Sequence, residues 1–235
     1  MVLTTIPYND STQFVHIYTE AFGKITCRLS VGRRKKGAAQ RSLYAPFSVL
    51  DIVIDRQNSH GIASIIEASP VLSSYMLSAT DPAKAAQCMY MAELLDKTIG
   101  EVENNPKLWQ FVSHSAELLQ LTTEGAANFH LVFTTRLCYY LGFHVDNSAY
   151  RKGMQFDISE GVFTAEPIYH PYYLTAESAG WLHLLLDTKF STLPSLRLTR
   201  KQRDTLLDMM LTFLRIHMPE AGELRCVDVL KDLFV

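Results

Sequence analysis

The sequence predicts an α+β protein in which a small five-stranded barrel precedes a mostly α-helical domain. Residues 1–69 contain five short segments rich in β-branched and aromatic side chains, separated by turn-forming residues. From Thr80 onward the apolar residues recur with helical spacing instead. The charge changes at the same point, because residues 1–79 hold eight basic and five acidic residues, whereas residues 80–235 hold fourteen and nineteen. We therefore expect a basic domain at 1–79 and a larger, mildly acidic domain at 80–235.

The third expected strand, at residues 24–31, has the clearest pattern of the five. Ile25, Cys27 and Leu29 alternate with Thr26 and Arg28, which is typical of a strand with one buried face. Closure into a barrel would remove the exposed edges that such a short sheet otherwise presents. The complete set of expected strands is 1–6, 13–19, 24–31, 47–54 and 62–67.

Helix-capping signals mark the elements of the second domain. Asp81-Pro82 and Asn105-Pro106 each combine an N-cap residue with proline at the first helical position. Thr199 and Gln202 form a capping box. Residues 144–174 break the helical pattern and predict an irregular insert with a hairpin-like excursion at 156–163. The expected helices span about 82–99, a segment from 106, 124–141, 175–187, a segment from 200, and 224–233.

Composition argues against several classes of protein. No apolar run approaches the roughly 20 residues of a membrane span, and the N-terminus lacks a signal-peptide pattern. The four cysteines are far apart in sequence, which favours reduced thiols over disulfides or a zinc site. We expect a cytoplasmic, nucleoid-associated protein without a cofactor.

Enzyme motifs are absent from the sequence. There is no phosphate-binding loop, dinucleotide fingerprint, nucleophile elbow or zinc-protease helix. The eight histidines are dispersed, and none has a second ligand at metal-binding spacing. Asp51 and Asp55 share a strand face, which leaves a metal-dependent nuclease as a remote alternative. We expect a protein that is not an enzyme and binds no metal.

A run of four cations indicates nucleic-acid binding. Arg33, Arg34, Lys35 and Lys36 stand between glycines, in the connection between the third and fourth expected strands. Cations on a flexible loop can follow a phosphate backbone, while aromatic side chains stack on bases. Phe14 and Tyr18 could provide such stacking or could pack the barrel against the helices, and Phe22 and Tyr44 are also nearby in sequence. The proposed DNA-binding residues are Lys24, Arg28, Arg33, Arg34, Lys35, Lys36 and Arg41.

A second group of cations lies at the start of the longest expected helix. Basic side chains oppose the helix dipole at this end, which suggests a use beyond helix stability. These residues could extend a nucleic-acid track, and surface solvation is the equally weighted alternative. The group comprises Arg197, Arg200, Lys201 and Arg203.

The order of these segments resembles the RecO family of bacterial recombination mediators over nearly the whole chain. The N-terminal part matches the family's OB-fold start through Tyr8, residues 17–19 and 22–24, and the basic run at 32–36. Residues 141–143, 156–163, 199–207 and 224–230 are similar to the Bacteroidetes variant of the family. Many members carry a four-cysteine zinc site, but residues 144–174 contain no cysteine, so we expect no zinc.

The resemblance implies a non-enzymatic function in DNA repair and recombination. Family members bind single- and double-stranded DNA, anneal complementary strands, and act with RecR to help RecA load at gaps. They also contact the C-terminal tail of single-strand binding protein, and Arg136 is a possible rim residue for such a tail. The alternatives are an RNA-binding protein with the same barrel, the nuclease, and an adaptor without nucleic-acid contact.

Overall fold

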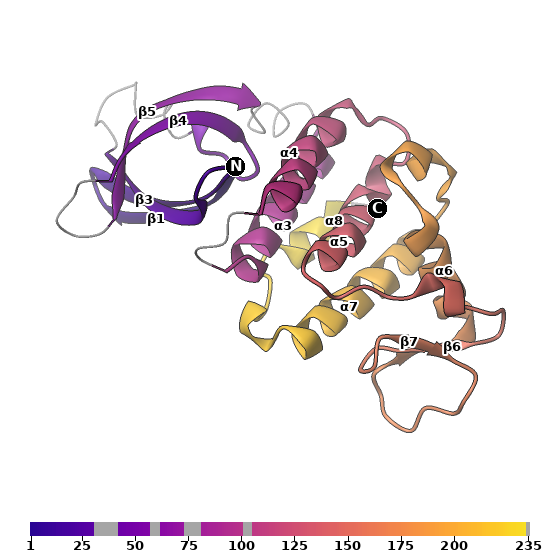
Figure 1. Ribbon diagram of the computed structural model, residues 1–235. Coiled ribbons are helices and arrows are strands. Elements are labelled where there is room, and N and C mark those ends of the chain that lie inside the picture. The colour runs from indigo at the N-terminus through magenta and orange to yellow at the C-terminus, as the bar shows by residue number, and fades with distance from the viewer. Residues whose placement is uncertain (31–41, 57–61, 73–80, 101–104, 234–235) are drawn as a thin grey trace. The chain divides into compact units, whose positions relative to one another are not determined.

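The computed structural model describes residues 1–30, 42–56, 62–72, 81–100 and 105–233 (Figure 1). The chain divides into two compact units, Met1–Leu121 and Thr122–Val235. The first unit contains the five strands together with the first two helices of the helical region. Although the helical pattern of the sequence begins at residue 80, the contacts within the protein group these two helices with the strands. The boundary at 79/80 remains a prediction.

Five strands form the N-terminal sheet: β1 (Val2–Asn9), β2 (Thr12–Thr19), β3 (Gly23–Ser30), β4 (Val49–Asp55) and β5 (Ala63–Leu72). Their order is β1-β2-β3-β5-β4, with β3 and β5 parallel and the other neighbours antiparallel. The five strands were all expected, and each described boundary lies within a few residues of the expected one except the end of β5.

Two hydrogen bonds connect the first strand to the segment that leads into β4. The Val2 amide donates to the Ser48 carbonyl at 2.8 Å, and the Phe47 amide donates to the Val2 carbonyl at 2.8 Å. Phe47 has φ 67°, a left-handed conformation that is rare for a bulky side chain. These bonds bring the two sheet ends together, so the OB-like barrel expected from the sequence is confirmed.

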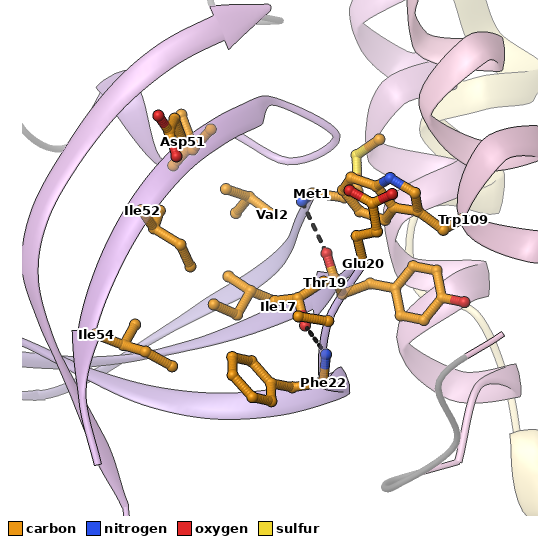
Figure 2. Close-up of a pocket in the computed structure, with 13 residues that line it drawn as sticks. Met1, Val2, Ile17, Thr19, Glu20, Phe22, Asp51, Ile52, Ile54 and Trp109 are labelled. Atoms are coloured by element: carbon orange, nitrogen blue, oxygen red, sulfur yellow. Dashed lines mark hydrogen bonds between the residues drawn. The ribbon is translucent and has the colours of Figure 1, made fainter. Parts of the chain in front are cut away.

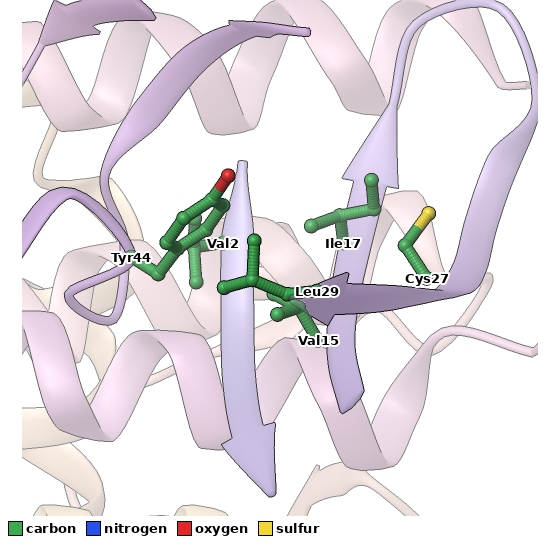
Figure 3. Close-up of a cluster of buried hydrophobic side chains, with 6 residues drawn as sticks. All are labelled: Val2, Val15, Ile17, Cys27, Leu29 and Tyr44. Carbon is green, nitrogen blue, oxygen red and sulfur yellow. The ribbon is translucent and has the colours of Figure 1, made fainter. Parts of the chain in front are cut away.

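The barrel interior is filled by side chains from several strands (Figure 3). Cys27 and Leu29 of β3 are buried, whereas Arg28 between them is exposed, as the alternation predicts. Because this alternation assigns each side chain to one face, it also determines which residues can meet a ligand outside the barrel. The buried cluster consists of Val2, Val15, Ile17, Cys27, Leu29 and Tyr44.

Helices α3 (Pro82–Thr98) and α4 (Pro106–Leu121) complete the first unit. Asp81 accepts a hydrogen bond from the Lys84 amide at 3.0 Å, and Asn105 accepts one from the Leu108 amide at 3.1 Å. Both side chains occupy the N-cap role that the sequence predicts, where they satisfy helix donors that have no partner within the helix.

The second unit is built on three helices: α5 (Phe129–Tyr140), α6 (Ala176–Asp187) and α7 (Arg200–His217). A shorter helix, α8 (Val227–Leu233), follows them. Thr199 and Gln202 form the expected capping box at the start of α7. The core of this unit includes Phe129, Phe133, Leu137, Leu182, Leu185, Leu206 and Leu214.

The predicted start of the third helix at residue 124 is wrong. Gly125 has φ 73°, and a 3₁₀ turn at Ala126–Asn128 precedes α5. A Cβ atom on Gly125 would lie 2.7 Å from the Leu193 carbonyl oxygen, so this position needs glycine both for its conformation and for its close packing. Ala126 and Ala127 have high helix propensity, so local propensity does not mark the start of α5.

The insert forms a small three-stranded sheet of β6 (Gln155–Asp157), β7 (Val162–Thr164) and β8 (Tyr173–Leu174). The hairpin of β6 and β7 was predicted, whereas the short β8 was not. The Asp157 carboxylate accepts hydrogen bonds from the Ser159 and Glu160 amides and lies 3.1 Å from His170 Nε2. These contacts connect the β6–β7 turn to the segment that leads into β8.

Across the part of the chain that the structure describes, no helix combines the length and apolar character needed to cross a bilayer.

Candidate nucleic-acid interface

The predicted basic run lies in the connection that follows β3. Arg33, Arg34, Lys35, Lys36 and Arg41 lie outside the described residues. The chain enters this segment directly after Ser30, the last residue of β3. Ser30 is paired with Thr12 at the beginning of β2, which places the exit from β3 next to the β1–β2 turn.

The outer face of β1, β2 and β3 carries a group that we call the ledge: Ile6, Tyr8, Phe14 and Arg28. Ile6, Phe14 and Arg28 form one row across the three strands, because Phe14 is paired with Ile6 on one side and with Arg28 on the other. Tyr8 lies at a register shift near the end of β1, and its ring meets Phe14 edge-on at 5.3 Å. Tyr8 is 68% exposed and Arg28 is also exposed, so both can meet a ligand.

Lys24, at the other end of β3, has a carboxylate partner. Its Nζ atom lies 3.0 Å from Asp96 Oδ1 on α3 and also bonds to the Asp96 carbonyl. His16 Nδ1 lies 2.9 Å from the same carboxylate. Burial alone would raise the pKa of Asp96, but the hydrogen bonds and charges of His16 and Lys24 outweigh it and hold that pKa below its ordinary value. A phosphate would therefore compete with Asp96 for the Lys24 ammonium.

The aromatic residues near the basic run have different environments. Tyr18 packs on Trp109 of α4 with ring centroids 5.8 Å apart, and its hydroxyl donates to the Asn105 carbonyl at 3.3 Å. Tyr44 is buried in the barrel core. Of the two residues that could have packed the barrel against the helices, Tyr18 does so, whereas Phe14 faces outward beside Tyr8.

A cavity of about 240 Å³ lies at one end of the barrel (Figure 2). Ile52 and Ile54 of β4 point into it toward Val2 and Ile17. Burial lowers the pKa of the Met1 amine to about 5, so this group carries little positive charge at neutral pH. Glu20 also lines the cavity, whose walls therefore suit an apolar group better than a phosphate.

Phe22 lines this cavity, and its ring contacts the guanidinium group of Arg56. The guanidinium carbon of Arg56 lies 4.6 Å from the centre of the Phe22 ring, within the range of a cation–π contact. Arg56 is not among the DNA-binding residues that the sequence predicts. The contact joins the β2–β3 turn to the end of β4, so sequence spacing gives no signal for it.

The second group of cations at α7 is only partly available. Arg203 is half-buried and donates to the Leu198 carbonyl at 2.9 Å, and Arg200 lies 3.8 Å from Asp204. Among the described residues, Arg197 and Lys201 are exposed and have no ion-pair partner. These two side chains are the ones most available to a ligand.

Arg136 donates from its Nη2 atom to the Thr188 carbonyl at 2.9 Å, at the end of α6. The preceding residue, Thr135, lines a small apolar hollow of about 30 Å³ between α5, α6 and α7. The hollow is lined by Thr135, Cys138, Phe143, Val145, Leu182, Leu186, Met209, Met210 and Phe213.

The acidic pair considered for a nuclease lies on the outer face of β4. Asp51 and Asp55 are both exposed, and Val53 lies between them on the same face. Among the described residues there is no cluster of three or more potential metal ligands.

Comparison with known proteins resolves the relationship of the chain. The family model described as "Recombination protein O N terminal" matches residues 1–74, and the one described as "Recombination protein O C terminal" matches residues 79–222. The chain belongs to the RecO family. The proteins named "DNA repair protein RecO" from Phocaeicola vulgatus and Bacteroides fragilis are each 31% identical to it, covering the whole chain and 97% of each relative. The RecO protein of Azobacteroides pseudotrichonymphae is 26% identical over the same extent.

Proposed function

We propose that this member of the RecO family of DNA repair and recombination proteins binds single- and double-stranded DNA and anneals complementary strands. The distribution of charge around the barrel supports the proposal. Strands β1, β2 and β3 contain no acidic residue, and β3 leads directly into the basic run at 33–36. Strands β4 and β5 contain Asp51, Asp55 and Glu67 and no basic residue. DNA phosphates are therefore favoured on the β1–β3 side and disfavoured on the β4–β5 side.

Exposure and ion pairing rank the described residues of the proposed DNA-binding set. Arg28 is exposed on the ledge, while Arg33, Arg34, Lys35, Lys36 and Arg41 follow it in sequence. Lys24 contributes less, because Asp96 already neutralises it. Arg197 and Lys201 of the second unit are candidates for a longer track, with Arg200 and Arg203 supporting them.

Replacing Arg33, Arg34, Lys35 and Lys36 by alanine tests the proposal. Each neutralised phosphate contributes about 0.7 to the log–log salt slope on single strands, so loss of four contacts should reduce the slope by about 3. Fluorescence anisotropy with a labelled oligonucleotide at several salt concentrations measures the slope. A matched control replaces four cations outside the proposed set, Lys107, Lys152, Lys189 and Arg215. An equal loss of slope in both variants would contradict a specific role for the run.

The family relationship also supports a set of protein partners. We propose that the protein acts with RecR and with the C-terminal tail of single-strand binding protein, and thereby helps RecA to load at gaps. A tail of acidic and apolar residues needs an apolar hollow near a cation. The hollow between α5, α6 and α7, with Arg136 next to Thr135 in sequence, supplies both kinds of group within the second unit.

The alternatives are separable by simple measurements. Competition between DNA and RNA single strands of equal length would identify a preference for RNA. Incubation of labelled DNA with Mg²⁺ or Mn²⁺ would reveal a nuclease at Asp51 and Asp55, and an intact substrate would argue against it. Absence of binding to any nucleic acid would favour the adaptor.

Annealing of complementary strands without ATP is expected, and a strict nucleotide requirement would contradict the mediator function.

A further inference from the structure

The ledge carries an aromatic pair, in which Tyr8 is largely exposed and Phe14 is half-buried. Tyr8 is 68% exposed and Ile6 is 44% exposed, although both are large apolar or aromatic residues at the end of a strand. Tyr8 does not project freely, since its ring meets Phe14 edge-on at 5.3 Å and an interplanar angle of 63°. The contact restrains the Tyr8 ring while leaving most of the side chain accessible. A fixed, exposed aromatic ring of this kind is suited to binding.

The charge beside the pair indicates what it binds. Phe14 is directly paired with Arg28, and no acidic side chain among the described residues forms an ion pair with Arg28. Neither β1 nor β2 contains an acidic residue, and the acid closest to Tyr8 in sequence is Asp10, in the turn between these strands. A cation one strand spacing from Phe14 and two from Tyr8 matches the alternation of phosphate and base in a single strand.

We propose that Tyr8 and Phe14 stack on the bases of single-stranded nucleic acid while Arg28 binds a neighbouring phosphate. The proposal rests on the nucleic-acid binding inferred above and adds a second kind of contact to it. The cations at 33–36 can hold phosphates in either single or double strands, because both carry the same backbone charge. Stacking requires an unpaired base with an accessible face, so the ledge would distinguish single strands from duplex. It would not read sequence, because every base has such a face.

The experiment compares two probes that differ only in their bases. One is a labelled oligothymidine of roughly 20 nucleotides, longer than the roughly 4–16 nucleotides that one barrel occupies. The other is a strand of the same length with abasic sites throughout, which keeps the phosphates and removes the bases. We expect the full-length protein to bind oligothymidine at least about fivefold more tightly than the abasic strand, the lower limit for stacking on a single base.

Tyr8→Ala should remove much of this preference while leaving affinity for the abasic strand and the salt slope unchanged. Tyr8 is mostly exposed, so its loss should not prevent folding. Tyr8→Phe should preserve the preference, because it retains the ring. Phe22→Ala is the matched control, since Phe22 is also an exposed aromatic residue of the barrel but lies at the β2–β3 turn beside Arg56. Phe22→Ala should show the same preference for oligothymidine over the abasic strand as the unaltered protein.

Four outcomes would overturn the inference, and the last of them would also overturn the proposed function. Equal affinity of the unaltered protein for both probes would leave phosphate binding intact and remove the stacking contact. Equal weakening on both probes by Tyr8→Ala would assign Tyr8 to structure. An unchanged preference in Tyr8→Ala would leave the ledge available to a protein partner. If neither probe nor duplex DNA binds, the proposed function itself fails, and the inference fails with it.

Discussion

His130 shows how burial determines the charge of a single residue. Its side chain is 2% exposed within α5. Burial first, and then the positive charge of Arg203, lower the pKa of His130 to about 3. The imidazole is therefore neutral in the folded protein at every pH at which the protein would normally be studied.

This lowered pKa predicts an acid-dependent loss of stability. An unfolded histidine has a pKa of about 6.5, so between about pH 6.5 and pH 3 the unfolded state binds about one proton more than the folded state. The free energy of unfolding should fall as pH falls through this window, by up to about 1.4 kcal/mol per pH unit from this residue. Urea unfolding of the unaltered protein and of His130→Gln at several pH values measures the difference. Parallel pH curves for the two proteins would contradict the prediction.

The sequence could identify only some of the candidate residues. The outward direction of Arg28 can be predicted, because period-two alternation depends only on neighbours along one strand. This alternation cannot predict that Lys24 meets Asp96, since 72 residues separate the two positions. Tyr8 stands next to a turn segment and in a stretch that resembles the family, and neither feature predicts a binding role for its ring. Its contact with Phe14 depends on the pairing of β1 with β2, which leaves no mark in the composition.

At the scale of elements, Asp96 connects strands to a helix. Asp96 belongs to α3, and its carboxylate pairs with Lys24 of β3 and with His16 of β2. Its lowered pKa means that this contribution to stability is complete above the unfolded pKa of 3.8 and is lost as pH falls through the still lower folded value. Near neutral pH the contact contributes fully.

Asp96→Asn should destabilise the first unit by about 1–3 kcal/mol, because it leaves the partly buried Lys24 ammonium without its counter-charge. Chemical denaturation at neutral pH measures the change. Asp204→Asn is the matched control, since Asp204 also pairs with a cation, Arg200, but on the exposed surface of α7. That change should cost no more than about 0.5 kcal/mol. Equal losses for the two variants would show that the Asp96 contact has no special weight.

Element types were easier to predict than element boundaries. Prolines and capping residues identify the starts of α3, α4 and α7, because each signal acts within one helical turn. The start of α5 was missed because it depends on Gly125 meeting Leu193, a contact between segments distant in sequence. The short β8 exists only through its pairing with β6, so it has little pattern of its own.

At the scale of the whole molecule, two units have separate cores. The barrel core is formed by residues of β1, β2 and β3 with Tyr44, whereas the second core is formed by α5, α6 and α7. The change from strand to helix pattern at residue 80 does not reveal that α3 and α4 group with the barrel. Contacts such as Tyr18 with Trp109 determine that grouping, and they are invisible to a pattern read along the chain.

The Tyr18–Trp109 contact also has an optical consequence. The chain contains two tryptophans, Trp109 in the first unit and Trp181 on α6 in the second. Trp181→Phe would leave an indole that reports on the packing of α4 against the barrel, and Trp109→Phe would leave one that reports on the helical unit. Because each unit has its own core, we expect the two variants to show different midpoints of fluorescence change in urea.

Far-ultraviolet circular dichroism of each variant provides the control, since it should show the same overall transition in both. Coincident fluorescence midpoints would mean that the two units unfold as one. The chain thus carries a separate intrinsic fluorophore for each unit, and the unfolding of each unit can be followed without any attached dye.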